Sequence, residues 1–520
     1  MRDNTRPLRI LFSVRNPSYV RHYDSVLRAL AARGHEIELT SEDRRFKGWP
    51  PSVNALADAH SNIRLSLTPS MDRTPWFELA TRLRQARFYL RFLDARYRGT
   101  PGLLARTREK APPLVVRLAE SPLGRQRWAR RLLVRVIDVL ERSTRTAAGY
   151  YDYLERTRPD VVILTPLVVL KTAQLDLARA AVERGVRNVF AVASWDHLSS
   201  KGELNFAPQR VVVWNDVQKR EAVELHGLPP ERVVITGSQV FDEWFTRRPS
   251  TTREAFCARV GLRPDRPIVL YVCSALLEGT PPEAPLVLEW ARQLRQSPYP
   301  VLRECGLLVR PHFKRGDEWR TVDFAGLENV VCWPPAGAVP VDAASKTDYF
   351  DSLYHAAATV GLNTSALIEA AILGRPVHTV LLPEYAESQE GTVHFHYLLD
   401  GPDALLHAAR SLGEHASLLA ASLDGRDPDP DRSARFVRRF VRPGAAGVPA
   451  AARFVEAVEA LAAQPPPAPE RPPAWTAIVR PLLVPFARAA AARVRRLHEE
   501  RRALKEARAR ARASARAQSR

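Results

Sequence analysis

One stretch, residues 348–380, constrains the fold more than any other, because it alternates helical and strand patterns. Apolar residues recur there at helical spacing before a short apolar run at 359–362, which is typical of a buried strand. Residues 366–373 are strong helix formers that end at Gly374 and Pro376. A strand that leads directly into a helix and then into another strand predicts an α/β domain with a parallel sheet.

The turn between that strand and its helix carries small polar residues. Asn363, Thr364 and Ser365 are helix-capping types, and Glu369 follows Ser365 by about one turn, so the two share a helix face. Unpaired backbone N–H groups and the positive end of the helix dipole make such a turn an anion site. We therefore predict that the turn binds a diphosphate and that Glu369 accepts hydrogen bonds from a sugar hydroxyl. An ordinary capped helix is the alternative.

The same turn carries a recognisable motif. The run N-T-S-A-L-I-E-A-A-I-L-G-R-P-V, residues 363–377, resembles the nucleotide-sugar signature of GT-B glycosyltransferases, roughly G-x-N-[TS]-x-x-x-E-A-x-x-x-G-x-P. The resemblance implies an α/β fold of two Rossmann-like, doubly wound domains that face each other across a cleft. It also implies that the small hydroxyl residues meet the diphosphate and that Glu369 meets the ribose.

Composition shifts divide the chain, whose 520 residues are too many for one hydrophobic core. We predict a Rossmann-like acceptor domain at 1–245 with a helical, basic insert at 76–146, a linker at 246–265, and a Rossmann-like donor-nucleotide domain at 266–462. A proline-rich linker at 463–474 and a basic tail at 475–520, either an amphipathic helix or disordered, complete the chain.

The first domain opens with a strand, a helix and a second strand at 8–14, 25–33 and 35–39. The spacing resembles the start of GT-B acceptor domains, although the usual glycine-rich turn is absent. In such enzymes a histidine in this turn often serves as the base. By spacing, that position falls on Tyr19 in this chain, and His22 and Asp24, one turn further along, are the candidate catalytic residues. Polar contacts at the helix start are the alternative.

A second motif, S-W-D-H-L-S-S-K-G at 194–202, follows a predicted strand, where open α/β sheets place ligands. Asp196 or His197 could deprotonate an acceptor hydroxyl, and Lys201 could face phosphate. The segment from about 155 to 400 resembles the surface-glycan branch of GT-B proteins, which includes CDP-glycerol glycerophosphotransferases and teichoic-acid enzymes. In the alternative interpretation, Asp196 only caps the next turn and the preceding tryptophan fills the seam between domains.

A third motif, R-P-H-F-K-R at 310–315, follows another predicted strand. Arg310, His312 and Lys314 supply up to three cations, which favours two phosphates over one carboxylate. The segment resembles the phosphate-facing histidine segment of glycerophosphate and capsule transferases. Ser274, at the end of the strand that opens the second domain, would also face the nucleotide. A solvated loop is the alternative.

The net charge of +20 is unevenly placed. Residues 76–146 hold 17 basic and 6 acidic residues, and residues 486–520 hold 12 and 3. Both segments mix arginines with apolar side chains at helical spacing, which suits an anionic membrane surface, although the stripes could instead pack on their own domain. Nucleic acid is ranked last, because RNA-binding proteins carry aromatic-rich basic strands and the charge here lies on helices.

No signal peptide, membrane span or metal site is expected. The four cysteines show no C-x-x-C pairing, and no run reaches the about 18 consecutive apolar residues that a membrane span needs. There is no D-x-D carboxylate pair at a strand end, so we expect neither a metal nor a further cofactor. We expect a cytoplasmic protein, peripheral on the inner face of the cell membrane.

These observations predict a metal-independent transferase. It would move a sugar or a polyol phosphate from a UDP- or CDP-linked donor to a surface-polysaccharide or lipid-linked acceptor. Two alternatives remain open: an enzyme similar to UDP-GlcNAc 2-epimerases, which resemble this chain in fold and donor, and a membrane-associated scaffold of GT-B fold without catalytic activity.

Overall fold

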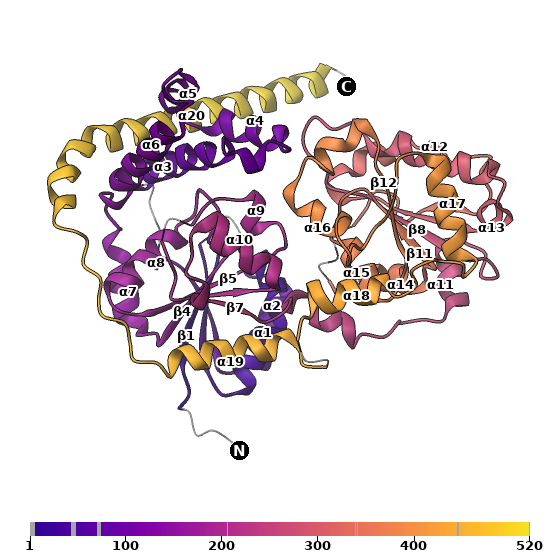
Figure 1. Ribbon diagram of the computed structural model, residues 1–520, viewed down its shortest axis with the longest axis horizontal. Helices are drawn as coiled ribbons and strands as arrows, with labels where there is room; N and C mark the ends of the chain where they lie inside the picture. The colour runs from indigo at the N-terminus through magenta and orange to yellow at the C-terminus, as the bar shows by residue number, and fades with distance from the viewer. Residues whose placement is uncertain are drawn as a thin grey trace.

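The protein consists of two α/β domains that lie side by side, with a layer of helices over the outer side of the first (Figure 1). The computed structural model describes residues 6–42, 48–69, 74–204, 206–338, 340, 342–444 and 447–518. Each domain is built on a parallel sheet whose strands are short apolar runs, because helices cover both faces and bury them.

The first sheet has the strand order β3-β2-β1-β4-β5-β6-β7. Its strands are β1 (Arg9–Val14), β2 (Glu36–Ser41), β3 (Ile63–Leu67), β4 (Val161–Thr165), β5 (Arg187–Ala191), β6 (Arg210–Val213) and β7 (Val233–Ile235). Phe12 of β1 lies opposite Leu39 of β2 and Ile163 of β4, all fully buried. The surrounding helices are α1 (Asp24–Ala32), α2 (Pro51–Ala59), α7 (Ala148–Thr157), α8 (Gln174–Glu183), α9 (His197–Ser200) and α10 (Asp216–His226).

The second sheet has the strand order β10-β9-β8-β11-β12-β13. Its strands are β8 (Ile268–Val272), β9 (Gly306–Arg310), β10 (Val330–Cys332), β11 (Ala358–Val360), β12 (Val377–Val380) and β13 (His407–Ala409). Its helices are α11 (Arg253–Val260), α12 (Glu283–Gln296), α13 (Pro300–Glu304), α14 (Ala343–His355), α15 (Ala366–Ile372), α16 (His396–Leu399), α17 (Leu412–Leu423) and α18 (Arg432–Phe436). Both strand orders reverse direction beside the first strand of the domain, as in doubly wound folds.

Short helices with 3₁₀ or π geometry join these elements. They are η1 (Pro17–His22), η2 (Ala95–Tyr97), η3 (Pro230–Arg232), η4 (Gln239–Phe245), η5 (Phe313–Trp319), η6 (Pro383–Ser388), η7 (Val393–Phe395) and η8 (Val437–Val441).

After the second domain the chain returns to the first. Helix α19 (Ala450–Ala462) buries Phe454, Val455 and Val458 in the core beneath β1, although we predicted this segment as part of the second domain. The place of a segment in the sequence does not say which sheet it covers. The return is fixed by Asp242, whose carboxylate accepts the first backbone N–H groups of α19 and pairs with Arg442 at 2.7 Å.

The predicted insert is helical. It comprises α3 (Pro75–Phe92), α4 (Pro101–Lys110), α5 (Pro113–Glu120) and α6 (Arg127–Arg142). The tail is helical in the structure: α20 (Trp475–Gln518) lies along α3 and also contacts α6 (Figure 1). Leu483 and Ala487 of α20 pack against Leu79, so part of the apolar pattern of both segments serves packing within the first domain. Among the described residues, no helix is long and apolar enough to cross a membrane.

Candidate active site

The site lies where the carboxyl ends of the two sheets face each other. Trp195, just after β5, donates from its indole Nε1 to Ser365 Oγ of the second domain at 3.2 Å. Its ring also packs edge-on against His394 of η7, with centroids 4.7 Å apart. Ser200 Oγ lies 3.3 Å from His394 Nδ1. The 194–202 motif of the first domain therefore meets the 363–377 motif of the second, as the resemblance implied.

Asp196 is the charged centre of the first-domain side. It precedes α9, accepts a hydrogen bond from Ser194 Oγ at 2.7 Å, and pairs with Lys201 Nζ at 3.0 Å. Burial alone would raise the pKa of Asp196, but Lys201, the nearby histidines and the Ser194 hydroxyl lower it below its ordinary value. Asp196 is therefore an anion at neutral pH, and Lys201 neutralises it rather than standing free to meet a phosphate.

Three histidines lie near this anion, of which His197 is buried and His22 and His394 are partly buried. Burial lowers the pKa of His22 to about 3 and those of His197 and His394 to about 4, so all three are neutral at pH 7 and only weakly basic in the free protein. Among the described residues, Nδ1 of His22 and Nδ1 of His197 are buried without a hydrogen-bond partner. His22 reaches the cluster from η1, and its ring centre lies 5.7 Å from that of Tyr19.

Asp24 does not join this cluster. It is the first residue of α1, is half exposed, and pairs with Arg28 at 2.7 Å one turn further along the helix. This placement does not test catalysis, so the catalytic role of Asp24 stays a prediction. The alternative, a polar contact at a helix start, describes it.

The turn that leads into α15 is held open toward the first domain. The backbone N–H of Asn363 donates to Ser274 Oγ at 3.0 Å, and its side-chain amide donates to the Ser388 carbonyl at 2.6 Å. In the part of the chain that the structure describes, the backbone N–H groups of Thr364 and Ser365 donate to no protein atom. The turn therefore presents two free donors at a helix start, next to Trp195.

Glu369 lies one turn into α15 and accepts a hydrogen bond from the Tyr349 hydroxyl. Burial raises the pKa of Glu369 to about 7, although the Tyr349 hydroxyl and the charge of Arg21 oppose the rise. Arg21 belongs to η1 of the first domain, so a charge from the other domain acts on Glu369. A buried carboxylate here can accept hydrogen bonds from a vicinal diol.

Arg310 does not offer the free charge that the sequence predicted. Its guanidinium is buried, pairs with Asp348 at 2.8 Å, donates to Ser352 Oγ at 2.7 Å, and lies 5.4 Å from the centre of the Tyr349 ring. It acts on the site indirectly, because it fixes Tyr349, which contacts Glu369.

His312 and Lys314 lie in the loop after β9. His312 caps η5 by accepting the Lys314 backbone N–H at 3.3 Å, and burial lowers the pKa of His312 to about 4. Lys314 is exposed and lies 5.9 Å from the centre of the Phe313 ring. Of the three predicted cations, Lys314 is the one that stays free for a ligand. Ser274 is buried and supports the turn through Asn363.

Sequence reasoning missed His394, Tyr349 and Arg21. His394 lies outside every motif, and only tertiary packing brings it to Asp196. Tyr349 lies on a helix whose apolar stripe gave no functional signal. Within the described residues, no group of three His, Cys, Asp or Glu side chains is arranged to hold a metal ion.

The sequence matches no known family model, and no curated protein matches it. Among solved structures, a glycosyltransferase from Rickettsia africae matches with a TM-score of 0.50 at 10% identity, over 89% of this chain and 100% of that one. A UDP-GlcNAc 2-epimerase from Neisseria meningitidis, solved bound to UDP-GlcNAc, matches with a TM-score of 0.44 at 11% identity, over 87% and 99%. WaaG, a glycosyltransferase involved in lipopolysaccharide biosynthesis, matches with a TM-score of 0.42 at 12% identity, over 88% and 100%.

At these sequence identities the structural similarity shows the fold and does not show the reaction. The predicted pair of facing Rossmann-like domains is confirmed by the two parallel sheets and by the match to the Rickettsia africae structure. The chain therefore has the GT-B fold, with its candidate site between the two domains.

Proposed function

We propose that the protein is a transferase that binds a nucleotide-activated donor in this site. The observation that carries the proposal is the open turn before α15, where the free N–H groups of Thr364 and Ser365 lie one turn from the buried carboxyl of Glu369. A diphosphate fits the two donors, and a ribose diol fits the carboxylate. Lys314 is available to add positive charge to the leaving diphosphate.

The transferred group is a sugar or a polyol phosphate, and the acceptor is a hydroxyl on a surface glycan or a lipid-linked glycan. Asp196 is an anion at pH 7, so it suits a positioning or electrostatic role, and the neutral His22 and His197 are the candidates for proton acceptance, although their low pKa values make them weak bases in the free protein. The donor enters as a UDP- or CDP-linked substrate, and the proposed reaction requires no metal or further cofactor.

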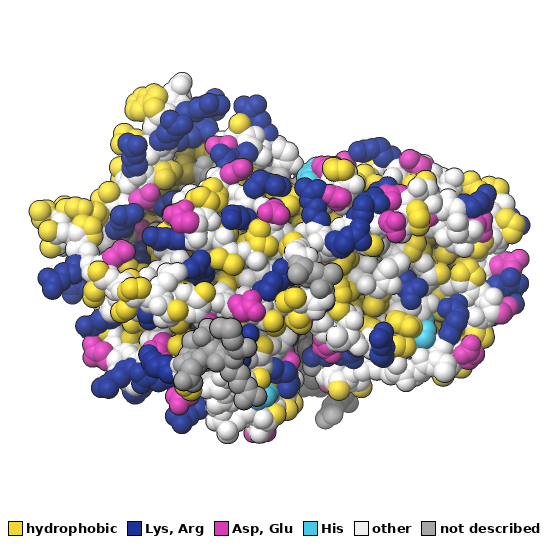
Figure 2. Space-filling model, turned by 60° about the horizontal axis from the view of Figure 1, so that its bottom comes forward, with side chains coloured by type: hydrophobic (Ala, Val, Ile, Leu, Met, Phe, Trp, Pro, Cys, Tyr) yellow, Lys and Arg dark blue, Asp and Glu magenta, His cyan; other side chains and the backbone are white. Residues whose placement is uncertain are grey.

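We further propose that the first domain docks on an anionic membrane, on the cytoplasmic side of the cell membrane, where lipid-linked acceptors are found. Helices α5, α6 and α20 expose large apolar side chains: Leu114, Leu118, Trp128, Leu132, Val136, Val139, Ile478, Leu482 and Phe486. Exposed Arg131, Arg135 and Arg142 line the stripe of α6. Figure 2, in which the bottom of the molecule comes forward, shows apolar and basic side chains side by side at its upper left edge, and such a mixture is the pattern of an interfacial surface.

Thermal unfolding with a panel of UDP, CDP, GDP and their sugar or glycerol derivatives tests the donor site. A ligand at a hundredfold excess over its dissociation constant stabilises the native state by ~2.7 kcal/mol. We expect one base to be preferred, and we expect Glu369→Ala to abolish the shift while Glu289→Ala, an exposed residue of α12, retains it. No shift with any nucleotide would refute donor binding and favour a scaffold.

Product analysis with the preferred donor then tests the reaction. The transferase turns over only when an acceptor is supplied. A change at the donor sugar without any acceptor would show an epimerase instead.

A further inference from the structure

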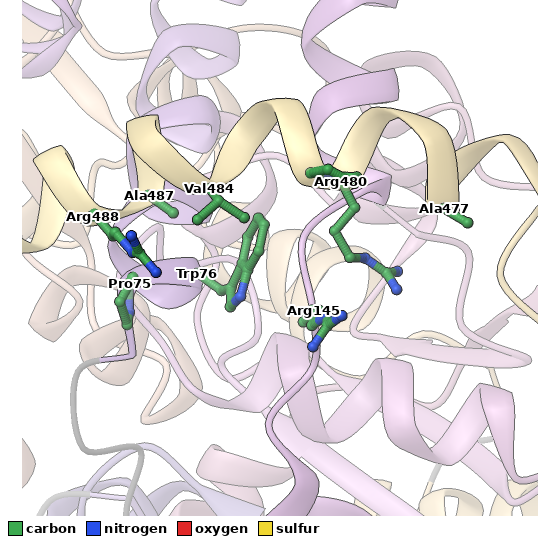
Figure 3. A pocket seen from close by; sticks show the side chains of 9 residues that line it. Pro75, Trp76, Arg145, Ala477, Arg480, Val484, Ala487 and Arg488 are labelled. Carbon is green, nitrogen blue, oxygen red and sulfur yellow. The ribbon is translucent and has the colours of Figure 1, made fainter.

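A second cavity lies far from the interdomain site, between the start of α3 and the first turns of α20. It has a volume of about 420 Å³. Figure 3 shows Trp76 in its centre, with Arg480 and Arg145 on one side and Arg488 on the other. The remaining lining residues are Pro75, Ala477, Pro481, Val484 and Ala487. We call it the arginine pocket.

Among the residues that the structure describes, the pocket is lined by three arginines and by no acidic residue. The guanidinium groups of Arg480 and Arg145 point toward each other (Figure 3). Within the described residues, Arg145 and Arg488 form no ion pair and no side-chain hydrogen bond. Like charges brought together in a partly desolvated cavity repel each other, so an anion bound between them is stabilised.

One of these arginines is held in place. Arg480 Nε donates to the Ser143 carbonyl oxygen at 3.1 Å, which leaves its two terminal nitrogens for a ligand. A guanidinium with a fixed plane and two free N–H groups matches the oxygens of a phosphate. Trp76 and Val484 meet beside it and give the pocket an apolar half.

A neighbouring cavity of about 300 Å³, further along α20, serves as an internal comparison. Its lining includes Arg82, Lys171 and Arg501, of which Lys171 pairs with Glu78 at 3.3 Å. Positive charge therefore lies along the whole contact between α3 and α20, and the arginine pocket differs from its neighbour in having no acidic residue among its described lining residues.

The surroundings of the pocket indicate an amphiphilic ligand. Ala477 and Pro481 line the pocket, and the residues that follow each of them, Ile478 and Leu482, are 75% and 68% exposed on the outer side of α20. An apolar chain that leaves the pocket can therefore lie on apolar side chains instead of entering water.

We propose that the arginine pocket binds the phosphate group of an anionic amphiphile, with the phosphate between Arg145 and Arg480 and the apolar portion against Trp76. A lipid headgroup and a free phosphate ion share the chemistry of the charged half. The apolar half distinguishes them, because inorganic phosphate gains nothing from Trp76.

Isothermal titration of the full chain, without nucleotide, tests the proposal with three soluble probes: dihexanoyl phosphatidylglycerol as monomers, inorganic phosphate, and dihexanoylglycerol, which lacks the phosphate. The variant Arg145→Gln/Arg488→Gln removes two pocket charges that make no bond in the described structure, so its fold and melting temperature are kept. The matched control is Arg248→Gln/Arg292→Gln, two exposed arginines outside the pocket and outside the helical layer of the first domain.

We expect the phospholipid to bind and the neutral lipid not to bind. The pocket variant should bind the phospholipid about tenfold or more weakly, because it removes charge-assisted hydrogen bonds to the phosphate, while the control variant binds as the wild type does. Trp76→Ala should weaken binding of the phospholipid and leave binding of inorganic phosphate unchanged. If inorganic phosphate binds as tightly as the phospholipid, the site serves a free phosphate, and the proposal of an amphiphile is overturned. Absence of binding by both phosphate probes, or equal affinity in the pocket variant and the control variant, also overturns the proposal.

Discussion

The affinity for a nucleotide should depend on pH through Glu369. Its pKa is raised to about 7 by burial, so about half of the free protein carries the charged carboxylate at pH 7. A ribose diol donates two hydrogen bonds and therefore needs the carboxylate. When only a fraction of the protein is competent to bind, the apparent dissociation constant rises by the inverse of that fraction.

The expected magnitude follows from the titration. With a pKa of about 7, almost all of the protein is competent at pH 8 and about one tenth at pH 6, so the apparent dissociation constant should rise about tenfold between these pH values. Glu369→Gln keeps the size of the side chain but cannot titrate. We expect it to bind nucleotide about 10- to 100-fold more weakly at pH 8, because one or more charge-assisted hydrogen bonds are lost.

Titration calorimetry with the preferred nucleoside diphosphate at half-unit pH steps measures both effects. The terminal phosphate of the nucleotide also titrates near pH 6, and the residual slope of Glu369→Gln reports that contribution. Tyr349→Phe is the matched variant: the lost hydroxyl no longer lowers the pKa of Glu369, so the midpoint should move to higher pH. Equal pH profiles for the wild type and Glu369→Gln would refute the assignment of Glu369 to the ribose.

Three further predictions concern the stability of the fold. Asp242→Ala should lower the free energy of unfolding in urea by about 3–5 kcal/mol, because it removes the cap of α19 and leaves Arg442 without its partner. The control Asp431→Ala loses no capping hydrogen bond and should change the free energy of unfolding little. Burial lowers the pKa of His415 to about 4, so on acidification the unfolded chain binds a proton at this histidine before the folded protein does. Up to about 3 kcal/mol of stability is therefore lost as the pH falls from 6.5 to 4. In His415→Leu the free energy of unfolding should fall less steeply with decreasing pH, and equal slopes for the variant and the wild type would contradict this. A double-mutant cycle of Trp195→Phe and Ser365→Ala in urea should give a coupling of about 0.5–1.5 kcal/mol for the hydrogen bond between the domains, and zero coupling would mean that this hydrogen bond contributes nothing.

The strands and the facing domains could be predicted because a parallel strand that is buried on both faces has a continuous run of apolar residues in the sequence. The expected strand at 8–14 is β1, Arg9–Val14, and the expected strand at 160–164 is β4, Val161–Thr165. Residues directly after such strands meet at one edge of each sheet. For that reason Asp196 and Ser365, which are far apart in sequence, could be expected in one site, and they flank the same Trp195 contact.

The remainder of the site depends on side-chain partners that no local pattern reveals. Arg310 was expected to meet phosphate, but Asp348, 38 residues away, neutralises it. Lys201 was also expected to face phosphate, but it forms an ion pair with Asp196. In both cases spacing placed the cation in the correct loop and could not identify its counter-ion. His394 carries no motif at all, and only the docking of the two domains brings it to the cluster.

The path of the chain has a consequence for its biosynthesis. The core beneath β1 is closed by α19, and the outer helices of the insert are covered by α20, yet both are translated after the entire second domain. The amino-terminal half therefore leaves the ribosome with an open apolar face that stays uncovered until residues 450–490 emerge. A chain of residues 1–245 alone lacks α19 and α20, which cover its apolar faces. It should therefore depend more on chaperones than the carboxyl-terminal half, whose sheet is assembled from contiguous sequence.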